Sequence, residues 1–413
     1  MQEFNLPMRN KQTILALGAE SAGNFSVFKD GTVHFSQDFG NLMIDANFHE
    51  FTRNLSRFLK DKKIRPDVIL SDLHPLFHTT LLAQELAKKY KAEYVPVQHH
   101  LAHVFSSVGD RIIQNSKFKI QNSFLGIACD GTGFGFDEKI WGGEIFKFEV
   151  NKLMPGKLEA TRVGHLENQI LIGGEMAIKE PARIIISIIN KFPISNLQFT
   201  LKSQFPNIKN KKELAYNLVK KHYTKNEFEV LWNQLEQNFN CLETSSTARV
   251  LDAVSVLLGF SENERLSKHG PVELLEKNST KPYTDLKPKI ERYKIQNTRY
   301  KQVSNSNIQN SEEMLVLNTT YLFEYLIKNL HKDKRRLAAT AQKYIADGLL
   351  EINNEFIHNT SYKIHNTFFS GGMANNKIIS SLLESKGIYT NKKIPRGDAG
   401  VSFGQIFYYL LSK

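Results

Sequence analysis

Three histidines stand close together in the stretch VQHHLAH, at residues 97–103. If a helix begins near His99, then His99 and His103 lie on one face of it, about one turn apart. Two imidazoles at this spacing can hold a metal ion, but one exposed and one packed histidine would give the same pattern. His100 points away from that face, so it is free to meet a substrate or simply to stack.

Two aspartates lie at the ends of predicted elements, Asp130 after a predicted strand and Asp398 before a predicted helix. Asp130 comes directly after the apolar run FLGIAC, so we expect it at the end of a strand. The glycines of the following DGTGFG allow the backbone to approach a phosphate closely, although a plain hairpin turn fits as well. Asp398, in RGDAG, opens the last predicted helix, where it is either an N-cap or a metal ligand.

A second glycine turn, SGG at residues 370–372, follows the predicted strand NTFF. A strand, a glycine turn and a helix N-terminus form a ready site for an anion, and the alternative is an ordinary strand-to-helix turn. Each of these patterns is weak when taken alone. Together they predict a nucleotide beside a metal ion.

Short strands and amphipathic helices alternate along the chain and must position these residues. The pattern predicts a strand at 14–18, a hairpin at 24–40, a helix at 47–62, a strand at 66–75 and a helix at 79–90. Such alternation is typical of an α/β fold, in which ligands bind at the carboxyl ends of the strands.

The strand-turn-strand pattern starts again at residues 124–150, which suggests an internal duplication. Residues 151–244 look mostly helical and polar, whereas residues 281–312 are rich in Lys, Asn and Ser. We expect an insertion or a poorly ordered connection in the second of these segments.

The bulk composition narrows the class of protein. A chain of 413 residues fits two large domains. Its net charge of +12 comes from scattered lysines without a basic stripe, so we expect no nucleic-acid partner. Two distant cysteines exclude a disulfide framework and a CxxC zinc site. Since we find neither a signal core nor a membrane-length apolar run, we expect a cytoplasmic protein.

In many ordered motifs the chain resembles the carbamoyltransferase domain of the hydrogenase maturation factor HypF. It is more distantly similar to the O-carbamoyltransferases and to the tRNA threonylcarbamoyl transferases. The motifs are ILALGAE, SQDFGNL, SDLHP, VQHHLAH, ACDGTGFG with IWGGE, VGHLENQILIGGEMAIKEPAR, TSSTARVLDAVSVLLG, SGGMANNKII and PRGDAGVSFGQ. SDLHP and GGEMAIKEPAR favour the hydrogenase branch.

The resemblance implies an actin/sugar-kinase/Hsp70-like (ASKHA) fold, with two RNase-H-like lobes and a nucleotide cleft between them. We expect the N-terminal lobe at residues 1–122 and the C-terminal lobe at residues 123–413. The second lobe would carry helical insertions at about 151–243 and a polar insertion at about 278–315.

The resemblance also implies a set of site residues. The ligands of a divalent Fe or Zn ion would be His99, His103, Asp130 and Asp398. ATP or AMP, in the form of carbamoyl adenylate, would lie against Asp130, Gly131, Thr132, Gly133, Ser370, Gly371, Gly372 and Asn375. The candidates for catalytic roles are His100, His74 and Asp72, and a solvated histidine before Pro75 is an equal alternative for His74.

The implied reaction moves a carbamoyl group from carbamoyl adenylate to the C-terminal cysteine thiol of a HypE-like maturation protein. That thiocarboxamide is a precursor of the cyanide ligands of [NiFe] hydrogenase. A metal and backbone N–H groups beside the phosphate suit this chemistry, and no protein nucleophile is required. The chain begins just ahead of the transferase motifs, so we expect a separate protein to form carbamoyl adenylate.

Several positions depart from the family pattern and leave alternatives open. His269 and Pro271 stand in place of a Glu-Gly-Gln sequence, Ala182 in place of Trp, and Ala248 in place of Gly. The segment RRLAATAQKY looks more like the O-carbamoyltransferases. The alternatives are an O-carbamoyltransferase with a small hydroxyl acceptor, a non-catalytic nucleotide-binding scaffold for a partner with the missing domains, and, more weakly, a sugar kinase.

Overall fold

Six strands from the N-terminal part of the chain form the first sheet, in the order β1-β4-β3-β2-β5-β6. Their bounds are β1 (Gln2–Asn5), β2 (Ile14–Ala16), β3 (Ser26–Lys29), β4 (Thr32–Phe35), β5 (Val68–Asp72) and β6 (Glu93–Val97). The structure is a computed structural model, and it describes residues 1–6, 10–115, 117–118, 120, 122–150, 158–193, 208–295, 308–359 and 364–412.

The second sheet has the order β12-β13-β9-β8-β7-β14-β15 along its main path, and two short strands pair beside β8. The main strands are β7 (Ser123–Phe134), β8 (Ile140–Val150), β9 (Leu158–Leu166), β12 (Ile290–Lys294), β13 (Ile308–Leu317), β14 (Thr367–Ser370) and β15 (Tyr389–Thr390). The two short strands are β10 (Gln169–Ile172) and β11 (Cys241–Thr244).

The two sheets repeat one topology. In the first, β2 pairs antiparallel with β3 and parallel with β5, and β6 follows in parallel. In the second, β7, β8, β14 and β15 take the same places with the same directions. This repetition supports the predicted internal duplication. The expected ASKHA architecture of two RNase-H-like lobes is confirmed.

The helices cover the outer faces of both sheets and fill the space between them. On the first sheet lie α1 (Asp45–Asp61) and α2 (His78–Tyr90). Between the sheets lie α3 (His99–Gln114) and α14 (Val401–Ser412). The second lobe contains α4 (Met176–Lys179), α5 (Ala182–Asn190), α7 (Lys211–Val219), α8 (Lys225–Glu236), α9 (Thr247–Leu258), α10 (Gly270–Lys277), α11 (Thr319–Lys328), α12 (Lys334–Asn359) and α13 (Lys377–Ser385).

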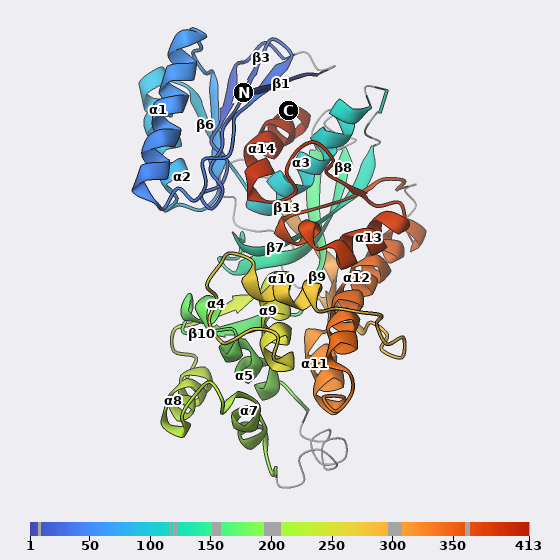
Figure 1. Cartoon of the computed structure of the whole chain (residues 1–413). Coiled ribbons are helices and arrows are strands. Elements are labelled where there is room, and N and C mark those ends of the chain that lie inside the picture. The colour runs from blue at the N-terminus through green and yellow to red at the C-terminus, as the bar shows by residue number, and fades with distance from the viewer. Residues whose placement is uncertain are drawn as a thin grey trace.

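Alternation along the central strands explains the layers. In β2 and the residue after it, Leu15 and Leu17 pack toward α1 and α2, whereas Ile14 and Ala16 pack toward α14. Successive side chains of a strand point to opposite faces, so this short apolar run buries both faces of the sheet. Figure 1 shows α3 and α14 in the upper part of the molecule, beside the first lobe drawn in blue.

The helices α3 and α14 touch through their backbones. A Cβ atom placed on Gly404 of α14 would lie 1.8 Å from the carbonyl oxygen of Ala102 in α3. A Cβ atom on Gly109 of α3 would lie 2.6 Å from the ring of Phe407. Only glycine lets the two helices approach this closely at these positions.

One expectation about the second lobe is wrong in part. Residues 151–243 were expected to be helical insertions, but β9, β10 and most of β11 lie in this range, and β9 pairs with β8 in the main sheet. The alternating burial of β9 is a strand pattern, so the helical part of this range begins only at α4. Residues 151–157 and 194–207 lie outside the described residues.

The predicted polar insertion at about 278–315 contains strand residues in its described part. Within it, β12 and β13 form an antiparallel pair at the edge of the second sheet. Residues 296–307, between these strands, lie outside the described residues. Among the helices that the structure describes, none is both long and apolar enough to cross a membrane.

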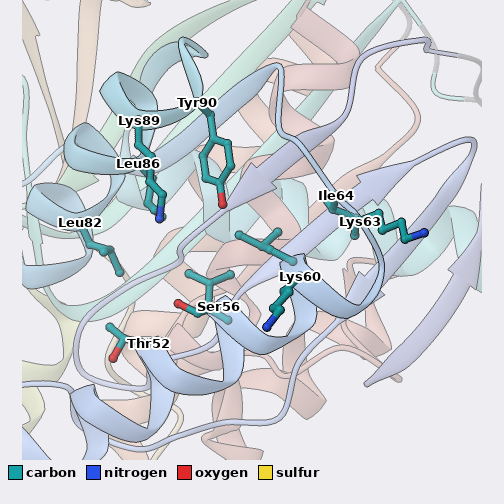
Figure 2. Close-up of a pocket in the computed structure, with 11 residues that line it drawn as sticks. Thr52, Ser56, Lys60, Lys63, Ile64, Leu82, Leu86, Lys89 and Tyr90 are labelled. Atoms are coloured by element: carbon teal, nitrogen blue, oxygen red, sulfur yellow. The ribbon is translucent and has the colours of Figure 1, made fainter.

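The outer face of the first lobe has a groove of about 400 Å³ between α1 and α2. Figure 2 shows its apolar wall, with Leu82 and Leu86, and the side chains of Lys60, Lys63 and Lys89 near it. The lining contains neither a carboxylate nor a histidine. The candidate chemistry therefore lies elsewhere.

The contact between α3 and α14 leads to a test of stability. We expect Gly404→Ala to lower the free energy of unfolding by about 2–3 kcal/mol, because the added methyl group must push two packed backbones apart. Urea unfolding of the full chain measures this change. Gln84→Ala, on the exposed side of α2, is the control and should change the free energy by less than about 0.5 kcal/mol. Equal stability of the two variants would contradict this account of the helix contact.

Candidate functional site

A cleft of about 740 Å³ lies between the two lobes. Both lobes contribute to its lining, with Glu20, Ser21 and Phe77 from the first and Gly131, Thr132 and Gly372 from the second. Many of the lining residues follow the carboxyl ends of central strands, which is where ligands bind in α/β folds. The cleft between the lobes therefore lies where the site was expected from the sequence, at the ends of strands and in the turns that follow them.

The two histidines of the i, i+4 pair open helix α3. The helix begins at His99 because the side chain of Gln98 accepts a hydrogen bond from the backbone N–H of Leu101 at 3.0 Å. One helical turn then brings the Nε2 atoms of His99 and His103 to 3.1 Å from each other. Both imidazoles are buried.

Two carboxylates meet this histidine pair. Asp130 Oδ2 lies 3.1 Å from His99 Nε2 and 3.2 Å from His103 Nε2. Asp398 Oδ1 lies 3.5 Å and 3.4 Å from the same two atoms. Each of the four residues offers one ligand atom, and these atoms all lie within 4.8 Å of one another.

This geometry fits a divalent cation. Donor atoms bound about 2.1 Å from a tetrahedral ion lie roughly 3.4 Å apart, and the five separations above are close to that spacing. In addition, Asp398 Oδ1 is buried and has no hydrogen-bond partner in the structure. Two imidazole nitrogens and two carboxylate oxygens suit Zn²⁺ and Fe²⁺ alike.

The pKa values of the cluster residues indicate that the cluster favours positive charge between its two carboxylates. Burial would lower the pKa of His99, but the carboxylates of Asp72, Asp130 and Asp398 raise it well above its usual value. Burial would also raise the pKa of Asp130, yet the two imidazoles hold that pKa well below its usual range. Without a metal the buried carboxylates are charged and rely on protonated imidazoles, and a cation would take the place of those protons.

Asp72, predicted as a catalytic residue, lies behind the histidine pair. Its Oδ2 atom is 2.6 Å from His99 Nδ1, and its Oδ1 atom accepts a hydrogen bond from the backbone N–H of His74. A carboxylate on the far nitrogen of a ligating histidine fixes the ring orientation and the tautomer. The geometry therefore gives Asp72 a positioning role on His99.

The structure does not bring His100 or His74 to the lining of the cleft. His100 is fully buried, with Nδ1 2.9 Å from the side-chain amide nitrogen of Gln98 and with Nε2 unpartnered. Burial lowers its pKa to about 3, so the ring is neutral. The ring of His74 stacks on Phe77, with centroids 4.2 Å apart. Contact of either histidine with a substrate stays a prediction.

The first glycine turn follows a break in the β7–β8 ladder. The register shifts between Cys129 and Gly133, which frees Asp130 and the next residues from regular pairing. Gly131 and Thr132 line the cleft. Gly133 lies against the histidines instead, because a Cβ atom there would be 2.4 Å from His100 Cε1.

The second glycine turn contacts Asp130 of the cluster formed by His99, His103, Asp130 and Asp398. Gly371 has φ +98°, and a Cβ atom on it would lie 2.2 Å from the carbonyl oxygen of Cys129, so this position requires glycine. The turn directs the backbone N–H of Gly372 to Asp130 Oδ1 at 3.1 Å. The Ser370 hydroxyl donates to the carbonyl oxygen of Arg396, and neither Ser370 nor Asn375 lines the cleft.

A buried carboxylate holds the segment that carries Asp398. Asp110, on α3, accepts hydrogen bonds from the backbone N–H groups of Lys392, Lys393 and Ile394 at 2.7–2.9 Å, and from the Tyr389 hydroxyl at 2.6 Å. The same helix thus supplies the two histidines of the cluster and fixes the segment that carries Asp398.

Several cleft residues were not predicted from the sequence. Lys268 Nζ lies 2.8 Å from Asp398 Oδ2, and Ser21 also donates to that carboxylate. Arg249, Arg265 and Lys179 line the cleft as well. Of the departures from the family pattern, His269 and Ala248 lie in the lining, whereas Pro271 and Ala182 do not. No sequence signal separates these cations from the scattered surface lysines.

Comparisons with known proteins show similarity along nearly the whole chain. The family model described as "Carbamoyltransferase, Kae1-like Domain, second subdomain" matches residues 126–405, and the "HypF Kae1-like domain" matches residues 9–110. The probable carbamoyltransferase HypF of Methanocaldococcus jannaschii is 34% identical over 98% of this chain and 47% of its own length. Carbamoyltransferase HypF of Synechocystis sp. is 28% identical over 63% of this chain and 31% of its own length.

Solved structures show the same fold. A full-length HypF in a phosphate- and nucleotide-bound form has a TM-score of 0.77 at 23% identity, covering 99% of this chain and 47% of that one. HypF of T. kodakarensis has a TM-score of 0.75 at 28% identity, covering 99% of this chain and 48% of that one. The chain thus spans about half the length of these HypF proteins.

The four-residue cluster predicts stoichiometric metal binding. We expect the purified chain to bind one Zn²⁺ or Fe²⁺, and His103→Ala to weaken binding at least roughly 100-fold, since it removes a ligand atom. Competition with a chromogenic chelator measures the affinity. His49→Ala, which changes an exposed histidine on α1, is the control and should bind like the unchanged chain. Undiminished affinity in His103→Ala would show that the ion binds elsewhere.

The same cluster predicts how metal affinity depends on pH. Burial would lower the pKa of His103, but Asp130 and Asp398 raise it, and the pKa of His99 is raised too. A metal must displace these protons, so competition by protons should extend above the usual imidazole pKa of about 6.5. We expect the affinity to fall continuously as the pH is lowered from about 8 to about 6. Calorimetry in buffers of different ionisation enthalpy should also detect proton release, and a flat profile would contradict the assignment.

Proposed function

Since the chain belongs to the HypF carbamoyltransferase family, we propose that it transfers a carbamoyl group from carbamoyl adenylate to a cysteine thiol. The acceptor would be the C-terminal cysteine of a HypE-like maturation protein, in the assembly of the cyanide ligands of [NiFe] hydrogenase. In this reaction a bond forms between sulfur and the carbamoyl carbon, and the bond from that carbon to the phosphate oxygen breaks. AMP leaves, and the thiol proton passes to solvent.

The observation that carries the proposal is the cluster of His99, His103, Asp130 and Asp398 in a cleft with two glycine turns. A bound divalent Fe or Zn ion would supply a Lewis acid beside the acyl phosphate. The chain's own groups would orient the donor, with the backbone at Gly131 and Gly372 close to the phosphate. Retention of all four residues speaks against a scaffold without catalysis.

Neither cysteine of the chain offers a thiol to the cleft, which supports an acceptor from outside. Cys129 is fully buried, and burial raises the pKa of its thiol to about 12. Cys241 lies on β11 and does not line the cleft. The hydroxyl of Ser21 is engaged with Asp398. A partner that inserts a flexible chain end would bring the missing thiol.

The proposal includes the source of the donor and the compartment. Carbamoyl adenylate would come from a separate carbamoyl-adenylate-forming protein, and ATP or AMP would occupy the cleft only in this activated form or as product. The cytoplasm is the proposed location, because a reducing compartment keeps the acceptor thiol free.

A transfer assay tests the proposal. We expect the metal-loaded chain to carbamoylate a peptide with a C-terminal cysteine when carbamoyl adenylate is added, and intact-mass spectrometry to detect the added group. The transfer rate of His103→Ala should be at least about 100-fold lower, because this variant lacks one of the four side chains that would hold the metal ion. His49→Ala should retain the rate.

Two further peptides decide between the acceptor classes. A peptide ending in serine should stay unmodified, and so should the cysteine peptide with its terminal thiol alkylated. Modification of a small hydroxyl compound but not of the thiol would assign the chain to O-carbamoyl transfer. Binding of AMP with no transfer to any acceptor would contradict the proposal and favour the scaffold.

A further inference from the structure

The N-terminus of α9 is attached to the first glycine turn. The Ser246 hydroxyl caps the helix by accepting a hydrogen bond from the backbone N–H of Arg249 at 3.1 Å. The same hydroxyl donates to the carbonyl oxygens of Gly131 at 2.6 Å and Asp130 at 3.0 Å. The first turn of α9 is therefore fixed directly behind the backbone that lines the cleft, and Ala248 and Arg249 are themselves part of the lining.

Arg249 is a buried cation with unused donors. The residue is only 2% exposed, and its Nε and Nη1 atoms have no hydrogen-bond partner in the structure. Its one ion pair joins Nη2 to Asp252 Oδ2 at 3.0 Å, one helical turn further along α9. Unmade hydrogen bonds on a buried charged group are costly, so a ligand that accepts them would be favoured.

A second guanidinium shares the same carboxylate. Arg265 Nε lies 3.9 Å from Asp252 Oδ2 and also has no hydrogen-bond partner. Burial and the charge of Arg249 lower the pKa of Arg265 to about 10, so the Arg265 guanidinium is charged at neutral pH. Two positive charges against one carboxylate leave an excess positive charge at the wall of the cleft, which an incoming anion would neutralise.

The path from Arg249 to the cleft is open. A Cβ atom placed on Gly131 would lie 3.6 Å from Arg249 Nη2, so the glycine leaves no side chain between the guanidinium and the cleft. A guanidinium presents a planar fork that matches two oxygens of a phosphate, and a helix N-terminus adds backbone N–H groups and a favourable dipole. Neither the guanidinium groups nor the backbone N–H groups of α9 belong to the four-residue cluster of histidines and aspartates.

We propose that Arg249 and Arg265, with the N-terminus of α9, form a phosphate subsite in the same cleft that shares no residue with the cluster of His99, His103, Asp130 and Asp398. The ligand class is a phosphate ester such as a nucleoside monophosphate. The inference rests on the proposed function in one respect, since the phosphate of carbamoyl adenylate would be the natural occupant. Arg249 would bind the phosphate oxygens, and Asp252 would orient Arg249.

Binding measurements on the metal-loaded full chain test the subsite. We expect Arg249→Gln to weaken binding of AMP and of inorganic phosphate roughly 10- to 100-fold, because a charge-assisted pair of hydrogen bonds is lost. Arg249→Lys should lose less, since it keeps the charge without the fork. Arg57→Gln, on the exposed side of α1, is the matched control and should bind like the unchanged chain.

Three comparisons separate the subsite from a purely structural role. Adenosine, which lacks the phosphate, should bind Arg249→Gln and the unchanged chain equally, and so should Zn²⁺. Arg265→Gln gives a second variant in case Arg249→Gln does not fold, and it should weaken phosphate binding in the same direction. Unaltered AMP and phosphate affinity in folded Arg249→Gln, or in Arg265→Gln together with Arg249→Lys, would overturn the proposal.

The outcomes for the subsite and for the transferase are distinguishable. If the unchanged chain carbamoylates the cysteine peptide but Arg249→Gln binds AMP normally, the subsite is wrong and the transferase stands. If Arg249→Gln loses AMP binding but the unchanged chain transfers no carbamoyl group, the subsite stands and the transferase is wrong.

Discussion

The backbone contact between α3 and α14 is the constraint on which the site depends. Gly404 of α14 leaves room for the carbonyl oxygen of Ala102, the residue before His103 in α3. Because the helices meet this closely near their N-termini, the imidazoles at the start of α3 come within reach of Asp398, which directly precedes α14. Four polar side chains distant in the sequence are thereby held in one small volume, despite the repulsion between the two carboxylates.

The repeated topology explains why the site forms where it does. Each lobe ends its sheet with a parallel edge strand, β6 or β15, and the chain then continues into a helix that packs between the lobes. His99 begins the first of these helices, and Asp398 precedes the second. The site therefore uses corresponding positions of two similar halves, and Asp130 completes it from the end of the regular part of β7. Neither half could build the cluster alone.

Much of this arrangement could be predicted from residue patterns, and the reasons differ between residues. The i, i+4 spacing of His99 and His103 is local, so helix geometry alone brings them together. Asp130 and the glycine turns follow strongly apolar strands, and the ends of such strands can be predicted from the sequence. The strands β10 and β11 were missed because each has only four residues and they lie among helical segments, and β9 was missed although its burial alternates as in a strand.

Other features depend on long-range contacts that no local pattern encodes. Asp72 contacts His99 only through the parallel pairing of β5 and β6. Arg249 is a polar residue in an apolar helix, and it is buried next to the point where Ser246 binds the first glycine turn. His100, next to the ligand pair in sequence, is enclosed by the register shift of β7 instead of facing the cleft.

The hydrogen bonds between Asp110 and the segment before Asp398 limit how a ligand can enter and leave the cleft. Since α3 carries the two histidines and also binds residues 392–394, rotation of one lobe against the other would separate helices that touch through their backbones. A ligand that enters or leaves the cleft therefore has to do so without rotation of the lobes. Lys268, in the exposed residues 266–269, binds both Ser21 and Asp398 at 2.8 Å and so joins this segment to both lobes beside the cleft.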